Sequence, residues 1–157
     1  MHFPPQSIIE DFINSLHQRI KSSPKEIPSF TQIYDYDWEI VANSKNSVES
    51  TQFSTYHSEV LCIQNAQEKL KNKYLDRCHL LTALEPCSMC TGAIIQSRIS
   101  TVTYFAEHYK IPGISSYSLE FLAKSNHFPK IVYIPDNSVT LVFKEFFEKI
   151  RKKNYLL

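Results

Sequence analysis

Two short segments of this chain of 157 residues place reactive side chains at the predicted starts of two helices. The first segment is His57-Ser58-Glu59, and the second is Pro86-Cys87-Ser88-Met89-Cys90. Cys87 and Cys90 are three residues apart, so a helix start can direct both thiols to one point. If His57 serves the same point, the fold has to bring the two helix starts together. No other feature of the sequence constrains the fold as strongly.

The composition is that of an ordinary globular protein, with 43% hydrophobic and 21% charged residues. No apolar run approaches the roughly 20 residues of a membrane span, and the N-terminus has no secretory pattern. The net charge of +1 argues against a strongly basic nucleic-acid binder. We expect one domain over residues 1–157 that is cytoplasmic, does not associate with membranes, and uses its cysteines as thiols or ligands.

Hydrophobic periodicity predicts helices that alternate with strands after residue 43. This alternation indicates a three-layer α/β fold with a five-stranded mixed sheet that is partly parallel. The predicted strands cover residues 30–36, 38–42, 78–84, 99–105 and 130–134, and the predicted helices cover 7–20, 57–71, 86–97, 117–125 and a segment that begins at Ser138.

Local signals mark several ends of these elements. Ser7 and Glu10 have the spacing of a capping box, and Ser138 is a candidate cap for the last helix. Pro86 suits the first position of a helix, where its missing N–H is not needed. Residues 43–55 are rich in Asn and Ser and are expected to form a loop, and Pro112-Gly113 is expected to form a turn.

His57, Cys87 and Cys90 are the donor types of a catalytic zinc site that leaves a fourth position for water. The helix N-terminus favours thiolates, and zinc lowers the pKa of bound water toward about 7. Glu59, two residues after His57, is placed to take a proton from that water and pass it to a substrate. This combination suits hydrolytic attack on an electron-poor carbon, followed by loss of ammonia.

The joint pattern of His-x-Glu and Pro-Cys-x-x-Cys is the signature of zinc deaminases. Residues 84–95 and Ser97-Arg98-Ile99 resemble the tRNA-specific adenosine deaminases, and His57-Ser58-Glu59-Val60 resembles their His-Ala-Glu-Ile segment. The resemblance implies a cytidine-deaminase-like fold, a homodimer, and conversion of adenosine to inosine at the wobble position of a tRNA anticodon loop. It also implies that Asn46 hydrogen-bonds the target nucleotide. A basic C-terminal helix adds to the likeness, with Lys149, Arg151, Lys152 and Lys153.

Two segments depart from that family. Pro28-Ser29-Phe30-Thr31 replaces the family's Pro-x-Gly-Ala, which predicts a bulky side chain near the pocket. Residues 105–113 replace a glycine-containing loop that grips the anticodon in the family, and Glu107 adds negative charge where a phosphate should pass. The altered 105–113 loop and the near-neutral net charge favour an alternative substrate, namely a free base or nucleoside such as guanine, cytosine or cytidine.

Three plainer interpretations remain open. The cysteines would instead form a closed structural zinc site if Cys62 or Cys78 supplied a fourth ligand. The chain would instead be a non-catalytic zinc-containing partner subunit, although such a protein is expected to lose Glu59. Asn46 lies in a polar segment, where an asparagine is more often a turn residue.

Overall fold

The computed structural model describes residues 3–108 and 110–154. Its core is a five-stranded sheet in the order β2-β1-β3-β4-β5, in which β1 pairs antiparallel with β2 and β3, and the pairs β3–β4 and β4–β5 are parallel. The strands are β1 (Phe30–Tyr34), β2 (Ile40–Lys45), β3 (His79–Leu84), β4 (Thr101–Ala106) and β5 (Lys130–Tyr133).

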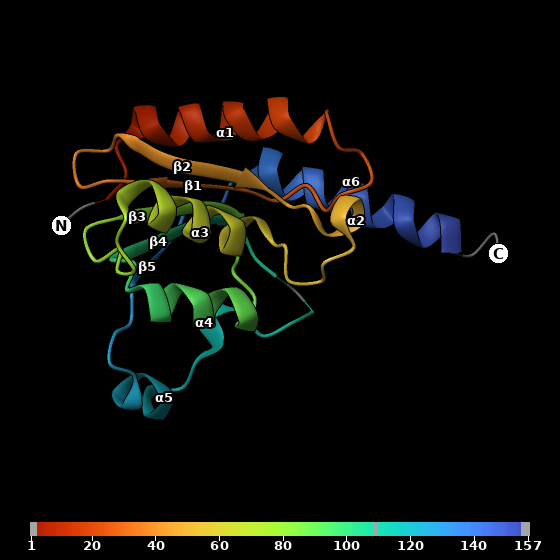
Figure 1. The fold of residues 1–157 in the computed structure, drawn as a ribbon. Helices are drawn as coiled ribbons and strands as arrows, with labels where there is room; N and C mark the ends of the chain where they lie inside the picture. The colour runs from red at the N-terminus through yellow and green to blue at the C-terminus, as the bar shows by residue number, and fades with distance from the viewer. Residues whose placement is uncertain (1–2, 109, 155–157) are drawn as a thin grey trace.

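Helices cover both faces of the sheet (Figure 1), which confirms the predicted three-layer α/β fold with a mixed sheet. α3 and α4 pack on one face, and α1 and α6 pack on the other. The helices are α1 (Gln6–Ile20), α2 (Val48–Thr51), α3 (Ser58–Leu70), α4 (Ser88–Ser97), α5 (Leu119–Lys124) and α6 (Asn137–Asn154), with a short 3-10 helix, η1, at Ile114–Ser116.

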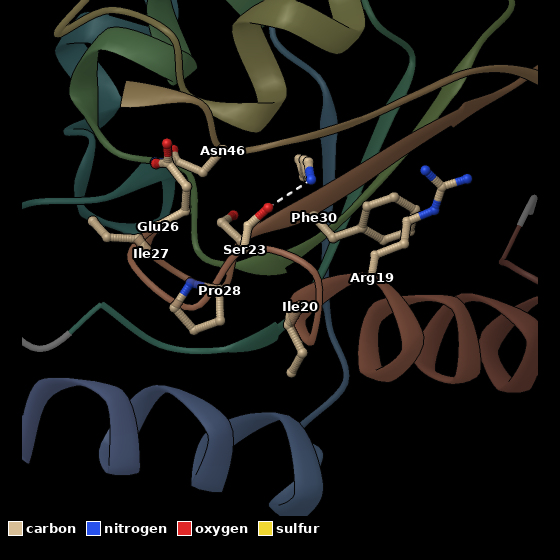
Figure 2. Close-up of a pocket in the computed structure, with 10 residues that line it drawn as sticks. Arg19, Ile20, Ser23, Glu26, Ile27, Pro28, Phe30 and Asn46 are labelled. Carbon is tan, nitrogen blue, oxygen red and sulfur yellow. Dashed lines mark hydrogen bonds between the residues drawn. The ribbon is translucent and has the colours of Figure 1, made fainter. Parts of the chain in front are cut away.

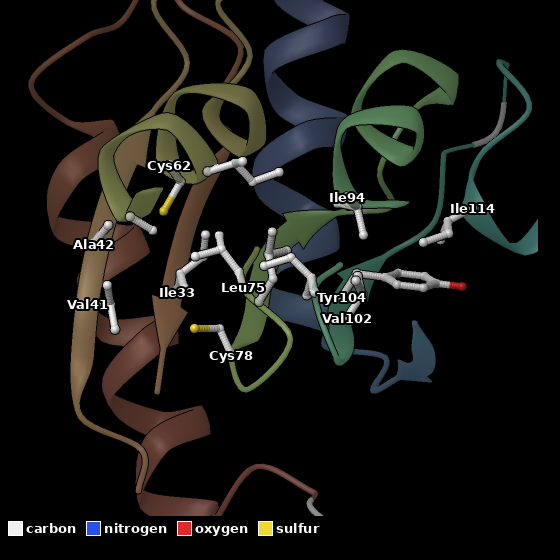
Figure 3. Packing of buried hydrophobic residues seen from close by; sticks show 14 residues of the cluster. Ile33, Val41, Ala42, Cys62, Leu75, Cys78, Ile94, Val102, Tyr104 and Ile114 are labelled. Atoms are coloured by element: carbon white, nitrogen blue, oxygen red, sulfur yellow. The ribbon is translucent and has the colours of Figure 1, made fainter. Parts of the chain in front are cut away.

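The central strand β3 is apolar on both sides, as expected for a strand covered by helices on both faces. Leu80 packs toward α3 and α4, whereas its neighbour Leu81 packs toward α1 and α6. Figure 3 shows the first of these clusters, in which Cys62 from α3 lies near Ile33 of β1 and Ile94 from α4 lies near Val102 of β4. Both helices are therefore held on one face by the same set of buried side chains.

Several predicted boundaries were wrong because tertiary contacts outweigh local signals. Residues 43–55 are not one loop: β2 continues to Lys45 by pairing with β1, and α2 follows. Ser7 lies inside α1 and caps nothing, because the helix begins at Gln6. Pro86 precedes α4, whose N-cap is Cys87. Gly113 does begin a turn, as predicted, because its carbonyl accepts the N–H of Ser116 at 3.0 Å, and it also forms an antiparallel bridge with Cys87.

The predicted cap of the last helix, Ser138, was also wrong, because the cap is Asp136, two residues earlier. The Asp136 carboxylate accepts the backbone N–H of Val139 at 2.9 Å and the hydroxyl of Ser138 at 2.6 Å. Ser138 therefore lies inside α6 and supports the cap without being it. Among the described residues, no helix has both the length and the apolar character needed to cross a membrane.

Asp136→Ala should lower the free energy of unfolding by about 1 kcal/mol at pH 7, the usual loss for an N-cap. Burial raises the pKa of Asp136, but hydrogen bonds from Ser138 and Val139 outweigh it, so the pKa is lowered overall. The ionised carboxylate thus favours the folded state above the unfolded pKa of about 3.9, and this contribution is lost as the pH falls through the lower folded value. Urea titrations from pH 7 to pH 3 should show the difference between wild type and variant shrinking.

Asp37→Ala is the matched control, since Asp37 is an exposed aspartate outside any helix. An equal loss of stability in both variants would contradict the capping role of Asp136.

Candidate active site

The structure brings His57, Cys87 and Cys90 together, with one potential ligand atom from each lying within 4.8 Å of the others. His57 Nδ1 lies 3.7 Å from the Cys87 sulfur and 3.6 Å from the Cys90 sulfur. His57 is the N-cap of α3, and Cys87 is the N-cap of α4. Both cap residues have extended backbone, which turns their side chains away from the helices and toward each other.

The three side chains form a strongly coupled group. A hydrogen bond from Cys90 lowers the pKa of Cys87 to about 3 against the opposing effect of burial, and His57 adds to the lowering. The hydrogen bond with Cys87 raises the pKa of His57, although burial opposes it. Metal binding needs thiolate sulfur and neutral imidazole nitrogen, so a cation bound at this point would displace the protons of the group. One nitrogen and two sulfurs are a donor set that fits zinc and leaves one tetrahedral position open.

Glu59 lies in the first turn of α3 and is buried, with 4% of its surface exposed. Burial raises the pKa of its carboxyl group, so the side chain holds a proton more readily than an exposed glutamate does. The hydroxyl of Ser58 donates to Glu59 Oε2 at 3.2 Å. Glu59 is therefore a buried and oriented carboxyl group in the helical turn that follows His57.

A chain of buried hydroxyl groups continues from Ser58 into the sheet. Ser58 Oγ lies 2.8 Å from Thr31 Oγ1, which lies 3.0 Å from Thr82 Oγ1. Ser29 Oγ lies 3.0 Å from Ser58 Oγ and joins the same network. This network was not predicted from the sequence. Its signal is the serine in His57-Ser58-Glu59, where the resembled family has alanine.

Asn46 is buried beside the carboxylate of Glu26, which was also not predicted from the sequence. Its Nδ2 donates to Glu26 Oε2 at 3.1 Å, and the backbone N–H of Ser50 donates to Glu26 Oε1 at 2.7 Å. Burial raises the pKa of Glu26, but these and other hydrogen bonds lower it overall. Figure 2 shows Asn46 and Glu26 at one end of a small pocket beside α1. Asn46 is thus fixed in orientation and is not a simple turn residue.

Phe30, expected to place a bulky side chain near the substrate pocket, instead packs on the sheet face covered by α1 and α6, opposite the face covered by α3 and α4. Its ring is fully buried, stacks on Phe12 of α1 at 5.5 Å, and lies under Arg19 (Figure 2). The neighbouring residue Thr31 faces α3 through its bond to Ser58. Because successive residues of a strand point to opposite faces, the replaced glycine position leaves the site itself unobstructed.

The closed zinc site with a fourth cysteine does not form. In the described part of the chain, the group of potential ligands contains neither Cys62 nor Cys78. Cys62 instead points to the backbone carbonyl of Thr31 at 3.6 Å, inside the apolar cluster under α3. Burial raises the pKa of both thiols, as expected for small core side chains.

Several sequence relatives of the chain are named as deaminases. A family model described as MafB19-like deaminase matches residues 10–151. The chain is 38% identical over 114 residues to the tRNA-specific adenosine deaminase of Aquifex aeolicus, which covers 72% of this chain and 76% of the relative. It is 32% identical over 137 residues to the enzyme of the same name from Rickettsia bellii, covering 84% of this chain and 93% of the relative.

A further relative is the guanine deaminase of Bacillus subtilis, 43% identical over 72 residues, or 46% of each chain. Among solved structures, one from work on A-to-I editing by tRNA:A34 deaminases has a TM-score of 0.70 at 25% identity and covers 92% of this chain and 99% of its own. The guanine deaminase of Nitrosomonas europaea has a TM-score of 0.75 at 19% identity and covers 93% of this chain and 86% of its own, which shows a shared fold.

The chain therefore belongs to the MafB19-like deaminases, in the group that includes the tRNA-specific adenosine deaminases. It is a hydrolytic deaminase with the fold of that group, as the sequence predicted.

Cys87→Ala should remove bound zinc, because two remaining ligands hold a divalent cation poorly and metal binding is coupled to folding. Wild-type protein purified with zinc should contain about one zinc ion per chain by elemental analysis, and the variant should contain much less than half of that. Its thermal midpoint should also fall.

Cys62→Ala provides the matched control, since it removes a buried thiol on α3 that points away from the ligand group. Full zinc content in Cys87→Ala, or equal loss in both variants, would show that the ligand assignment is wrong.

Proposed function

We propose that this deaminase is a single zinc-dependent domain that converts adenosine to inosine at the wobble position of a tRNA anticodon loop. The observation that carries the proposal is the meeting of His57, Cys87 and Cys90 beside the buried carboxyl group of Glu59. The substrate is inferred from the similarity to tRNA-specific adenosine deaminases over most of the chain. The homodimer implied by the resemblance and the cytoplasmic location expected from the sequence are part of this proposal.

In this proposal, zinc is held by His57 Nδ1 and by the sulfurs of Cys87 and Cys90. When bound, it supplies a water of lowered pKa for attack on the base. Glu59 takes the proton from the attacking water and delivers it toward the amino nitrogen that leaves. A C–O bond forms at C6, the C–N bond breaks, and water and adenosine become inosine and ammonia. Ser58 keeps the Glu59 carboxyl group in place during both proton transfers.

Binding of the flipped nucleotide is assigned to Asn46. Its bond to Glu26 fixes the plane of the amide and identifies which end carries the donor. A fixed amide can hydrogen-bond a nucleotide without first losing side-chain freedom, which favours binding.

The basic C-terminal end of α6 is assigned to binding the phosphates of the RNA backbone. Arg151, Lys152 and Lys153 lie in its last turn and are exposed. In Figure 1, α6 runs out past the sheet toward the end of the molecule where α2 lies. Cations at this end attract phosphates and release counterions on binding, so RNA affinity should fall with salt.

A second candidate substrate is guanine as a free base. It is favoured by the 43% identity to the guanine deaminase of Bacillus subtilis, although that match covers less than half of each chain. The retained Glu59 argues against a non-catalytic partner subunit, because such a protein has no need of a proton carrier.

Glu59→Ala should lower kcat for inosine formation in a tRNA anticodon stem-loop by at least about a hundredfold, the lower range for loss of a general acid–base group. Zinc content should stay unchanged, because Glu59 is not assigned as a ligand. Inosine is measured by digestion and chromatography of the product RNA.

The matched control is Glu68→Ala, on an exposed position of the same helix. Retained activity in Glu59→Ala would refute the proton-transfer role. Wild-type protein that releases ammonia from guanine and forms no inosine in RNA would replace the tRNA substrate with the second candidate.

Asn46→Ala should raise KM for the stem-loop by about tenfold with a smaller change in kcat, because the lost hydrogen bond binds substrate and transition state alike. Asn65→Ala is the control, since Asn65 lies on the exposed side of α3. An unchanged KM for Asn46→Ala would leave Asn46 with a purely structural role in holding Glu26.

A further inference from the structure

The Glu85 carboxylate lies at the end of β3, immediately before Pro86 and the predicted ligand Cys87. Only 5% of its surface is exposed. Glu85 Oε2 accepts the backbone N–H of His108 at 3.2 Å, and Oε1 accepts the backbone N–H and the hydroxyl of Ser115 at 3.0 and 2.5 Å. A buried carboxylate needs such donors, and here all of them come from the segment after β4.

Gly113 shows how closely this segment approaches the carboxylate. A Cβ atom at Gly113 would lie 2.4 Å from both Cδ and Oε1 of Glu85, closer than real side-chain contacts allow. The chain has only two glycines, and this one sits where any side chain would displace the carboxylate. The same stretch pairs with the turn before α4: Gly113 bridges Cys87, and the N–H of Ile114 donates to the carbonyl of Pro86 at 3.0 Å.

We propose that Glu85 is a positioning residue that holds the loop after β4, residues 107–108 and 110–116, as one wall of the substrate site. The loop leaves the carboxyl end of a parallel strand beside Cys87, and such ends border the substrate crevice in open α/β sheets. By fixing His108 and Ser115, Glu85 fixes the rim that the substrate passes. The identity of that substrate rests on the proposed function, whereas the anchoring of the loop does not.

The anchor requires a carboxylate specifically. Both oxygens of Glu85 accept backbone N–H groups, on opposite sides of the group. Glutamine has the same size but one of its two ends is an NH₂ donor, which would face a backbone N–H. Glu85→Gln therefore removes at least one of the two backbone hydrogen bonds that hold the loop, and it leaves no cavity.

Hydrogen exchange tests the anchor directly. In Glu85→Gln, the amide of His108, that of Ser115, or both should exchange at least about tenfold faster than in wild type, because a lost acceptor exposes the amide to local opening. Zinc content and the exchange of β3 amides should not change. Asp35→Asn is the matched control, since the Asp35 carboxylate accepts the N–H groups of Asp37 and Glu39 in the turn between β1 and β2. Unchanged exchange at His108 and Ser115 in Glu85→Gln would overturn the anchor.

Kinetics test the role of the wall. For whichever of the stem-loop RNA and guanine the wild type deaminates, Glu85→Gln should raise KM by about tenfold while kcat changes less, because the wall affects binding and not proton transfer. A lowered kcat with an unchanged KM would overturn the positioning role. If the wild type deaminates neither substrate, the proposed function fails, while the exchange measurement still decides the anchor.

A double-mutant cycle separates this contact from a general loss of stability. Gly113→Ala alone should also raise KM and loosen the loop, because its methyl group displaces the Glu85 carboxylate. Added to Glu85→Ala, it should have little further effect, since the group it strikes is already gone. Fully additive effects would show that the two residues act independently and would overturn the proposal.

Discussion

The meeting of two helix N-termini at one point is the constraint on which the rest of this structure depends. His57 and Cys87 are the N-caps of α3 and α4, and Cys90 lies one turn further along. The thiolate at Cys87 is favoured by its neighbours and by the helix end behind it. These donors meet only because both helices pack on the same face of the sheet, through a shared apolar cluster that includes Cys62 and Ile94. The buried core and the reactive centre are thus two results of one packing arrangement.

The sequence predicted the parts of this protein that are encoded locally. The spacing of Cys87 and Cys90, the apolar run of β3 and the alternation of elements are visible in the chain itself, and they gave the fold and the reactive group. The sequence did not predict the bond between Ser58 and Thr31 or the donors around Glu85, because these partners are far apart in the chain and meet only in the folded sheet. The predicted end of β2 at residue 42 came three residues too early for the same reason, since pairing with β1 outweighs the polar character of its last residues.

Buried carboxylates have two distinct uses around the site. Glu59 is assigned to proton transfer and lies beside the proposed zinc ligands His57, Cys87 and Cys90. Glu26 and Glu85 instead accept backbone N–H groups, and each holds a segment that borders the site: Glu26 holds Asn46 and the start of α2, and Glu85 holds the loop after β4. In the proposals made above, reaction and selectivity are therefore assigned to separate residues. Substitutions in the held segments can alter the substrate while leaving the reactive centre intact, which agrees with a fold shared by deaminases of different bases.

The buried hydroxyl chain that runs from Thr82 through Thr31 and Ser58 to Glu59 has a consequence for the carboxyl group at its end. Each hydroxyl can donate or accept, so the whole chain can reverse its direction by rotating O–H bonds, with no movement of heavy atoms. In one direction Ser58 donates to an ionised Glu59, and in the other it accepts from a protonated one. The hydroxyl chain can therefore offer a hydrogen-bond partner to either charge state of Glu59, and a change between them requires no rearrangement of the backbone.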